Sequence, residues 1–487
     1  MKKFYALLLG LLLIVSCSKS DDGPGGPDPN ADVTVQDFMW KAMNLWYFWQ
    51  SDVANLADDR FSTDQEYTNF LAATSDPSDF FFDQLLFNED RFSFLNSDYT
   101  ELTQNLSGIS RSNGLEFGLF LFQDSDDLFG YVRYIIPNSD ASTKDISRGE
   151  LFTGVDGQSL NIDNYRDLLF GDNATYTLNM ADISDGVISA NGKSVELTKQ
   201  EGLSENPVFI ANTLDVNGQK VGYLMYNGFT NEYDEDLNAA FGTFKTEGVT
   251  DLVLDLRYNG GGSVNTSRIL ASMIYGTFTD QLYIKQRWNE KLLDVFDPED
   301  LKDYFAANTN AGTPINSLNL SRVFVLVTNS SASASELVIN GLNPYIDVIL
   351  IGETTRGKNE FSLTMVDDPS REGAPYIYSS SRESQINPDN SWAIQPLVGR
   401  NENSVGFSDY TDGFSPTIML QEDLENLGTL GDPNEPLLAR ALQEIDGAGA
   451  KRDFTVGTPI ELYTSSRMFQ PIKDNMILDK PLNIKFK

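Results

Sequence analysis

Residues 323–342, VFVLVTNSSASASELVINGL, have the pattern of a buried strand, a turn of small residues and a helix. The apolar positions from Ala334 to Leu342 fall on one helical face, so the helix is expected to begin near Ser333. Its first backbone N–H groups then lack partners within the helix. A serine hydroxyl at such an end lies where developing negative charge is stabilised.

The same alternation continues on both sides of this stretch and predicts an α/β core. Short apolar runs indicate buried strands, and several are followed by helical patterns. The expected strands are 221–226, 252–256, 323–327 and 348–351, and the expected helices are 234–245, 263–275 and 333–342.

A structural interpretation of the serine turn competes with a catalytic one. Ser333 followed three residues later by Glu336, before an apolar run, is also a capping box. Taken alone, these two residues favour the cap.

A lysine 25 residues after Ser333 changes that balance. The chain has no histidine, so a serine nucleophile must use another base, and a buried lysine of lowered pKa can serve. Lys358 ends the turn Gly352-Glu-Thr-Thr-Arg-Gly-Lys358, directly after an expected strand. Because neighbouring parallel strands end at one sheet edge, Ser333 and Lys358 are expected within reach of each other.

The turn before Lys358 also fits G-x-x-x-x-G-K, the phosphate-binding loop. Two features argue against that alternative. Asn359 replaces the serine or threonine that would hold magnesium, and residues 361–366 have a strand pattern where the motif requires a helix.

A third motif, Leu254-Asp-Leu-Arg-Tyr-Asn-Gly-Gly-Gly262, closes one strand and precedes a helix. Consecutive glycines permit positive φ and close backbone approach, as an oxyanion-binding loop requires. The single cysteine excludes internal disulfides and cysteine-ligated metal clusters, and we expect no cofactor and no metal site.

The N-terminal region predicts export. Residues 1–17 have a basic start, a 12-residue apolar run and Cys17, and resemble a bacterial lipoprotein signal whose cysteine carries the lipid. Residues 18–34 predict an acidic Gly/Pro tether. The expected location is a bacterial envelope membrane, on its periplasmic face or at the cell surface. A net charge of −36 argues against nucleic acid as a partner.

Two modules are expected before the core. Residues 35–105 are rich in aromatics at helical spacing and predict a small helical module. Residues 106–200 are β-rich, and their order and spacing resemble a PDZ domain, in which an extended peptide adds as a strand. That resemblance places peptide binding at Leu115, Phe117 and Gly118. The core is expected over 201–445 and a tail over 446–487.

Together these motifs resemble the C-terminal processing (tail-specific) peptidases, serine peptidases with a crotonase-like (ClpP-like) α/β core and a PDZ domain. The resemblance makes Ser333 the nucleophile and Lys358 the general base, with Glu336 helping to orient the site. It assigns the oxyanion hole to backbone N–H groups of Gly261, Gly262 and Ala334.

The predicted function is therefore a serine endopeptidase that cleaves protein or peptide substrates through an acyl-enzyme. Its substrates could be bound by their C-termini through the PDZ-like domain. The alternative is a non-catalytic peptide-binding lipoprotein with a vestigial dyad. The oligomeric state and the role of the tail are not predicted.

Overall fold

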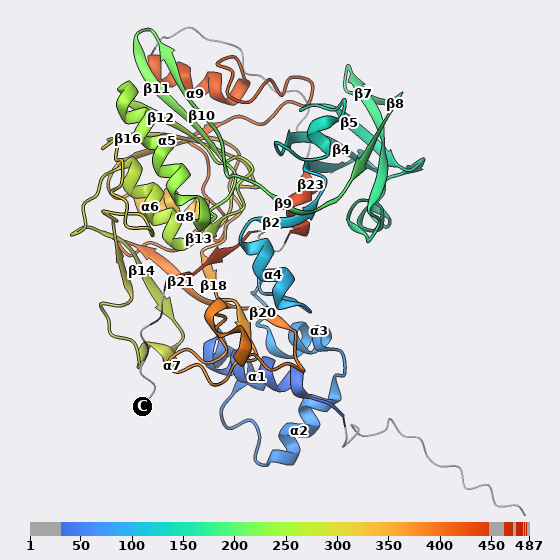
Figure 1. The fold of residues 1–487 in the computed structure, drawn as a ribbon, viewed down its shortest axis with the longest axis vertical. Coiled ribbons are helices and arrows are strands. Elements are labelled where there is room, and N and C mark those ends of the chain that lie inside the picture. Colours follow the sequence, from blue (N-terminus) through green and yellow to red (C-terminus); the bar gives the residue numbers. More distant parts are fainter. Residues whose placement is uncertain (1–30, 448–461, 471–473, 481, 483, 485–487) are drawn as a thin grey trace, which may run out of the picture.

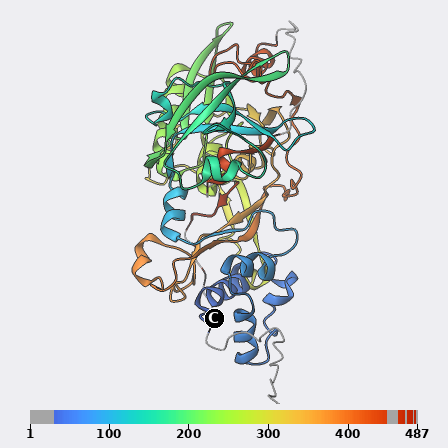
Figure 2. The same cartoon turned by 90° about the vertical axis from the view of Figure 1, so that its right-hand side faces the viewer.

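The computed structural model describes residues 31–447, 462–470, 474–480, 482 and 484. The signal sequence, Cys17 and most of the predicted tether lie outside the described residues. A helical N-terminal part lies at one end of the molecule, and the α/β core and a β-rich module lie beside each other at the other end (Figure 1 and Figure 2). No helix in the described part of the chain has the length and apolarity to cross a membrane.

The core sheet has the order β10-β11-β12-β16-β17-β22. Its strands run parallel from β11 to β22, and β10 is antiparallel to β11. All four strands expected from the sequence lie in this sheet. The bounds are β10 (Val208–Val216), β11 (Gln219–Tyr226), β12 (Asp251–Asp255), β16 (Arg322–Val327), β17 (Asp347–Gly352) and β22 (Ile418–Met419).

Helices cover both faces of this sheet, as the strands' continuous apolar sequence requires. Leu254 and Val325 pack in one cluster with α5 (Asp234–Glu247), α6 (Val264–Ile274) and α8 (Ala334–Leu342). Val253 and Phe324, which point to the opposite face, pack in another cluster with α9 (Pro436–Asp446).

A second sheet, β13-β24-β18-β21-β14-β15, extends the core, and the small sheet β1-β20-β19 lies near it. The central strand β24 comes from the tail, whose role the sequence did not reveal. The bounds are β1 (Phe94–Asn96), β13 (Gly262–Ser263), β14 (Leu282–Trp288), β15 (Lys302–Tyr304), β18 (Glu360–Ser362), β19 (Met365–Val366), β20 (Ala393–Gln395), β21 (Leu397–Asn403) and β24 (Met476–Ile477).

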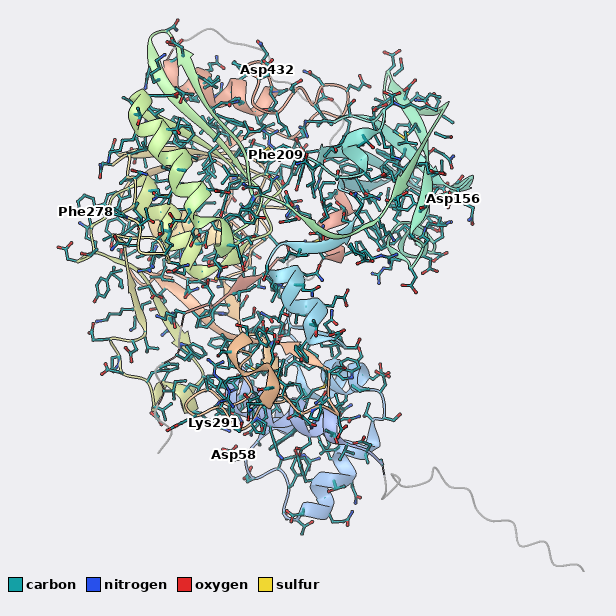
Figure 3. All side chains as sticks on the ribbon, viewed as in Figure 1. Asp58, Asp156, Phe209, Phe278, Lys291 and Asp432 are labelled. Carbon is teal, nitrogen blue, oxygen red and sulfur yellow. The ribbon has the colours of Figure 1, made fainter. Side chains whose placement is uncertain are left out.

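The N-terminal module is built on α1 (Thr34–Trp46), α2 (Asp64–Ala73) and α3 (Pro77–Phe80), with α4 (Tyr99–Leu106) after it. Its aromatic residues form core, and Trp46 is fully buried against Trp288. Lys291 of α7 (Glu290–Leu293) pairs with Asp58, and both are marked in Figure 3. The module is therefore fixed to the core.

The β-rich module, residues 109–204, has its own apolar core. Its main sheet has the order β23-β3-β4-β5-β7-β8, so strand β23 (Leu462–Ser465) of the tail lies at one edge. A short helical turn, η5 (Arg166–Phe170), packs against this sheet. The other bounds are β2 (Ile109–Ser112), β3 (Leu115–Leu121), β4 (Leu128–Ile135), β5 (Leu151–Val155), β6 (Gln158–Ser159), β7 (Thr175–Ser184), β8 (Val187–Thr198) and β9 (Gln200–Ser204).

A buried ionic network lies where β12 ends and the glycine turn begins. The guanidinium of Arg257 is fully buried, pairs with Asp255 at 2.8 Å and makes two hydrogen bonds to Glu435 at 2.7 and 3.0 Å. Glu422 joins it at 3.2 Å and also pairs with Arg148 of the β-rich module at 2.7 Å. The network connects α9, the glycine turn and the β-rich module.

Replacing Arg257 with methionine should lower the free energy of unfolding by about 3–5 kcal/mol, because two buried carboxylates lose their partner. The matched control is Arg287→Ala, which removes an ion pair with Glu402 from a side chain that is 61% exposed. That change should cost about 1 kcal/mol or less. Urea unfolding followed by tryptophan fluorescence measures both, and equal losses would contradict the role given to the network.

Candidate active site

Ser333 occupies the residue before the first turn of α8 and is fully buried. Its backbone has φ 64° and ψ −114°, a region that non-glycine residues adopt only under strain. Strain of this kind persists only where surrounding contacts hold it, and it gathers at functional sites.

Contacts from the glycine turn hold this strained serine turn. The Asn259 carbonyl accepts from Ala332 N–H at 3.1 Å and from the Ser335 hydroxyl at 2.9 Å. The Ser331 hydroxyl donates to the Leu256 carbonyl at 2.8 Å. The ends of β12 and β16 are therefore joined around Ser333, as parallel neighbouring strands allow.

The buried carboxylate of Glu336 accepts four hydrogen bonds. Its Oε2 accepts from the backbone N–H groups of Ser333 and Lys358 at 2.8 and 2.9 Å. Its Oε1 accepts from Gly357 N–H at 2.7 Å and from the Thr355 hydroxyl at 2.6 Å. One carboxylate thus binds both expected halves of the site together. Burial raises the pKa of Glu336 to about 7, although these four hydrogen bonds favour its ionised form.

Lys358 lies in the turn after β17 and has no exposed surface. Burial lowers the pKa of its ammonium group to about 8. The charges of Asp474, Glu360 and Asp90 oppose that shift by favouring the charged form. A lysine of this pKa is partly neutral near pH 8, as the role of a general base requires.

The capping interpretation fits the arrangement of both residues but leaves the Ser333 hydroxyl without a hydrogen bond. The two residues have the arrangement of a capping box, and the glutamate accepts from the Ser333 N–H. The Ser333 hydroxyl, in contrast, makes no hydrogen bond to any described residue. A buried hydroxyl without a partner carries a free-energy cost, which a purely structural serine would avoid.

The Lys358 ammonium is turned toward another partner. Its Nζ lies 3.4 Å from Oδ1 of Asn475, which directly precedes β24, and 5.1 Å from the ring centre of Phe92. The dyad residues are therefore adjacent in the fold, but the serine–lysine hydrogen bond of a working pair is not made in this structure. Such bonds are often loose until substrate binds.

The glycine turn lies directly against the serine. A methyl group added at Gly261, whose φ is 113°, would lie 2.6 Å from Cβ and 2.9 Å from Oγ of Ser333. Only glycine therefore fits at this position.

The three expected oxyanion donors differ in this structure. Gly262 N–H donates to the backbone carbonyl of Asn475 at 2.5 Å, so it does bind a peptide carbonyl. Gly261 N–H donates to Asn259 Oδ1 at 2.9 Å, a hydrogen bond within the turn. Ala334 is the first residue of α8, where N–H groups lack partners within the helix.

The expected peptide-binding residues lie on β3, and the edge of β3 away from β4 is not open. The side chains of Leu115 and Phe117 lie in the core of the β-rich module. The backbone of Gly118 is paired with Ser465 of β23. The chain's own tail therefore covers the strand to which a peptide would add.

Several residues near the dyad were not found by the sequence motifs. The Arg91 guanidinium donates to the Gly357 carbonyl at 2.6 Å, and Phe92 packs near the Lys358 ammonium. Asp474 and Asn475 come from the tail. Thr355 lies inside the lysine motif and could have been found there. The other four residues have no sequence motif around them that points to the site.

A pocket that is open to solvent lies beside the glycine turn, between the core and the β-rich module. Its walls include Gly260 and Gly261 of the glycine turn, Arg356 next to the lysine motif, and Asp474. Residues 462–465 of the tail also line it. The glycine turn can thus be reached from this side.

The pKa of Lys358 can be measured through stability. The unfolded lysine keeps its proton up to pH about 10.5, whereas the folded one loses it near pH 8. Between these values the unfolded state binds more protons, so the free energy of unfolding should rise with pH, by up to roughly 3 kcal/mol. The rise is absent below pH 8 and complete above pH 10.5.

Urea unfolding of the wild type and of Lys358→Met between pH 7 and 10 measures this effect. The wild type should gain stability relative to the variant as pH rises, since all other titrating groups are shared. Parallel stability curves would mean that the pKa of Lys358 is not lowered.

Comparison with known proteins finds similarity to one family of peptidases. A profile of peptidase family S41 matches residues 220–372, and a profile of the peptidase S41 N-terminal domain matches residues 34–94. The first match contains the glycine turn, Ser333 and Lys358, and the second covers the helical N-terminal module.

Two curated relatives are chloroplastic enzymes. The C-terminal processing peptidase of Tetradesmus obliquus is 27% identical over 250 residues, which cover 47% of this chain and 48% of the relative. Carboxyl-terminal-processing peptidase 3 of Arabidopsis thaliana is 26% identical over 275 residues, covering 53% and 49%. The chain spans about half the length of the curated relatives it matches.

A solved structure agrees over more of the chain. A protein of Bacteroides fragilis assigned to the S41 proteases superposes with a TM-score of 0.63 at 26% identity, covering 84% of this chain and 97% of that one. The likeness extends beyond the two matched regions. By sequence and by fold, the chain is similar to peptidase family S41 and to the carboxyl-terminal processing peptidases.

Proposed function

We propose that this protein is a serine endopeptidase that cleaves protein or peptide substrates through an acyl-enzyme. Ser333 is the nucleophile and Lys358 the general base. The observation that carries the proposal is the single buried carboxylate, Glu336, to which the backbone N–H groups of both residues donate. The relatives, named as C-terminal processing peptidases, support the same chemistry.

The proposed reaction uses only side chains, backbone N–H groups and water. Neutral Lys358 takes the proton as the Ser333 oxygen attacks the substrate carbonyl. The resulting oxyanion accepts hydrogen bonds from Gly262 and Ala334 N–H, at the start of a helix. The Lys358 ammonium then protonates the leaving amine, and a water molecule attacks the acyl-enzyme with the same lysine as base.

Glu336 is a positioning residue in this scheme, because it contacts neither reacting atom. It fixes the backbone of Ser333 and Lys358, and its hydrogen bonds extend to Thr355 and Gly357. The fully buried setting keeps water from Lys358 and so keeps its pKa low.

The finer architecture and the location belong to the same proposal. The core is crotonase-like, and the β-rich module is a PDZ-like peptide-binding domain; the strand β23, which is added antiparallel to β3, supports the second assignment. The protein is exported and lipid-anchored through Cys17 to a bacterial envelope membrane. The apolar run and the lipobox in the sequence support this location.

Removing either member of the dyad should lower hydrolysis of fluorescein-labelled casein at least about 10³-fold, because the nucleophile and its base act as a unit. The variants are Ser333→Ala and Lys358→Ala. Matched controls are Ser381→Ala and Lys285→Ala, which change exposed residues of the same types. Cleavage that survives both dyad substitutions would exclude the mechanism, whereas a folded wild type that cleaves nothing would favour a peptide-binding protein with a vestigial dyad.

The rate should rise with pH through an apparent pKa near 8. Below this pKa Lys358 is protonated and cannot accept the serine proton, whereas above it the base is neutral. The measurement is kcat/KM for a peptide substrate between pH 5 and 10. A profile that stays flat from pH 5 to 9 would contradict lysine as the titrating base.

A further inference from the structure

The tail contributes a strand to the edge of the β-rich module. β23 runs antiparallel to β3, with Thr464 opposite Leu119 and Ser465 opposite Gly118. The next residue continues the contact, since Phe117 N–H donates to the Ser466 hydroxyl at 3.0 Å. An added strand on a sheet edge is a common mode of peptide binding.

The residues after β23 form one helical turn, η8 (Ser466–Phe469), which is anchored by side chains. The Ser466 hydroxyl donates to Glu116 at 2.6 Å. Arg467 pairs with Glu205 at 2.6 Å and donates to the Asn227 carbonyl at 3.0 Å.

An aromatic contact also holds the tail against the β-rich module. The ring of Phe469 stacks on Phe170 of η5, with 3.9 Å between ring centres and 17° between planes. Tyr165 packs edge-on against the same ring. The tail therefore lies between β3 and η5 and fills the groove that they form.

The chemistry of this groove selects against a free carboxyl end. Two carboxylates, Glu116 and Glu205, face the bound segment and surround the Arg467 guanidinium. A terminal carboxylate placed here would meet two acids, and like charges at close range disfavour binding. The groove instead suits a hydroxyl, an arginine and an aromatic ring in the order Ser-Arg-x-Phe.

The same tail then lies in the catalytic site. Met476 and Ile477 of β24 pair in parallel with Gly262 and Ser263 of the glycine turn. The Asn475 backbone carbonyl accepts from Gly262 N–H, where the substrate oxyanion is expected, and its side chain holds the Lys358 ammonium. These contacts have the form of a bound peptide.

We infer that residues 462–470 and 474–477 are an intramolecular ligand that fills the peptide groove of the β-rich module and the catalytic site. A substrate must displace them, and a competing ligand is an internal segment with the pattern Ser-Arg-x-Phe rather than a free carboxyl end. The catalytic half of this inference rests on the proposed peptidase function.

Two substitutions in the tail test the inference without removing its strands. Phe469→Ala removes the ring stacked on Phe170, and Ser466→Ala removes the hydroxyl bonded to Glu116. The matched control is Phe278→Ala, which changes an aromatic residue that is 42% exposed. In Figure 3, Phe278 lies on the side of the molecule opposite Asp156, a residue of the β-rich module. Circular dichroism checks that each variant folds.

Binding is measured first, because it does not depend on catalysis. The probe is a fluorescein-labelled peptide with the sequence of residues 463–470 and an amidated end, followed by fluorescence anisotropy. It should bind Phe469→Ala at least about fivefold more tightly than wild type, since the competing internal segment is weakened. The same peptide with glutamate in place of arginine should bind no variant.

Casein hydrolysis is then measured on the same proteins. A second version of each protein, with Ser333→Ala added, serves as its blank. Both tail variants should hydrolyse casein about fivefold faster than wild type and the Phe278→Ala control. If hydrolysis depends on Ser333 but neither binding nor rate rises in folded tail variants, the tail is a structural strand and the inference fails. If binding rises but no variant shows Ser333-dependent hydrolysis, the groove assignment stands and the peptidase function fails.

Discussion

One buried carboxylate holds the two halves of the candidate site together. Glu336 accepts hydrogen bonds from Ser333 and Lys358 N–H, and from Gly357 and Thr355 beside the lysine. These bonds join the turn after β16 to the turn after β17, together with the hydrogen bond from Arg356 N–H to the Ser331 carbonyl at 3.0 Å. The strained backbone of Ser333 depends on the same contacts, because strain persists only where the surroundings fix it.

Burial has opposite uses at this site and at the network of Arg257. Around Lys358 it disfavours charge and lowers the pKa to about 8, which prepares a base. Around Arg257 the charge is kept and is matched by Asp255 and Glu435, which fixes the glycine turn. Both side chains are fully buried. Burial therefore prepares Lys358 for the proposed chemistry, whereas the buried ion pairs of Arg257 fix the position of the glycine turn.

The core strands and the meeting of the Ser333 and Lys358 turns could be predicted from the sequence because their signals are local. Apolar runs gave β11, β12, β16 and β17, and the absence of histidine led from Ser333 to Lys358. The rest depends on contacts between distant segments. No sequence pattern near Asn475 shows that its carbonyl accepts a hydrogen bond from Gly262 N–H. None near Phe469 shows that its ring stacks on the ring of Phe170. Likewise, no local pattern shows that Asn259 accepts the N–H of Gly261.

The most direct test of the central claim is to identify the acylated residue. A fluorophosphonate probe reacts with an activated serine, and peptide mapping by mass spectrometry locates the adduct. The adduct should lie on Ser333 and form faster as pH rises through about 8, where Lys358 loses its proton. An adduct on another serine, or none on Ser333 at pH 9 in the folded Phe469→Ala variant, would contradict a Ser333–Lys358 peptidase.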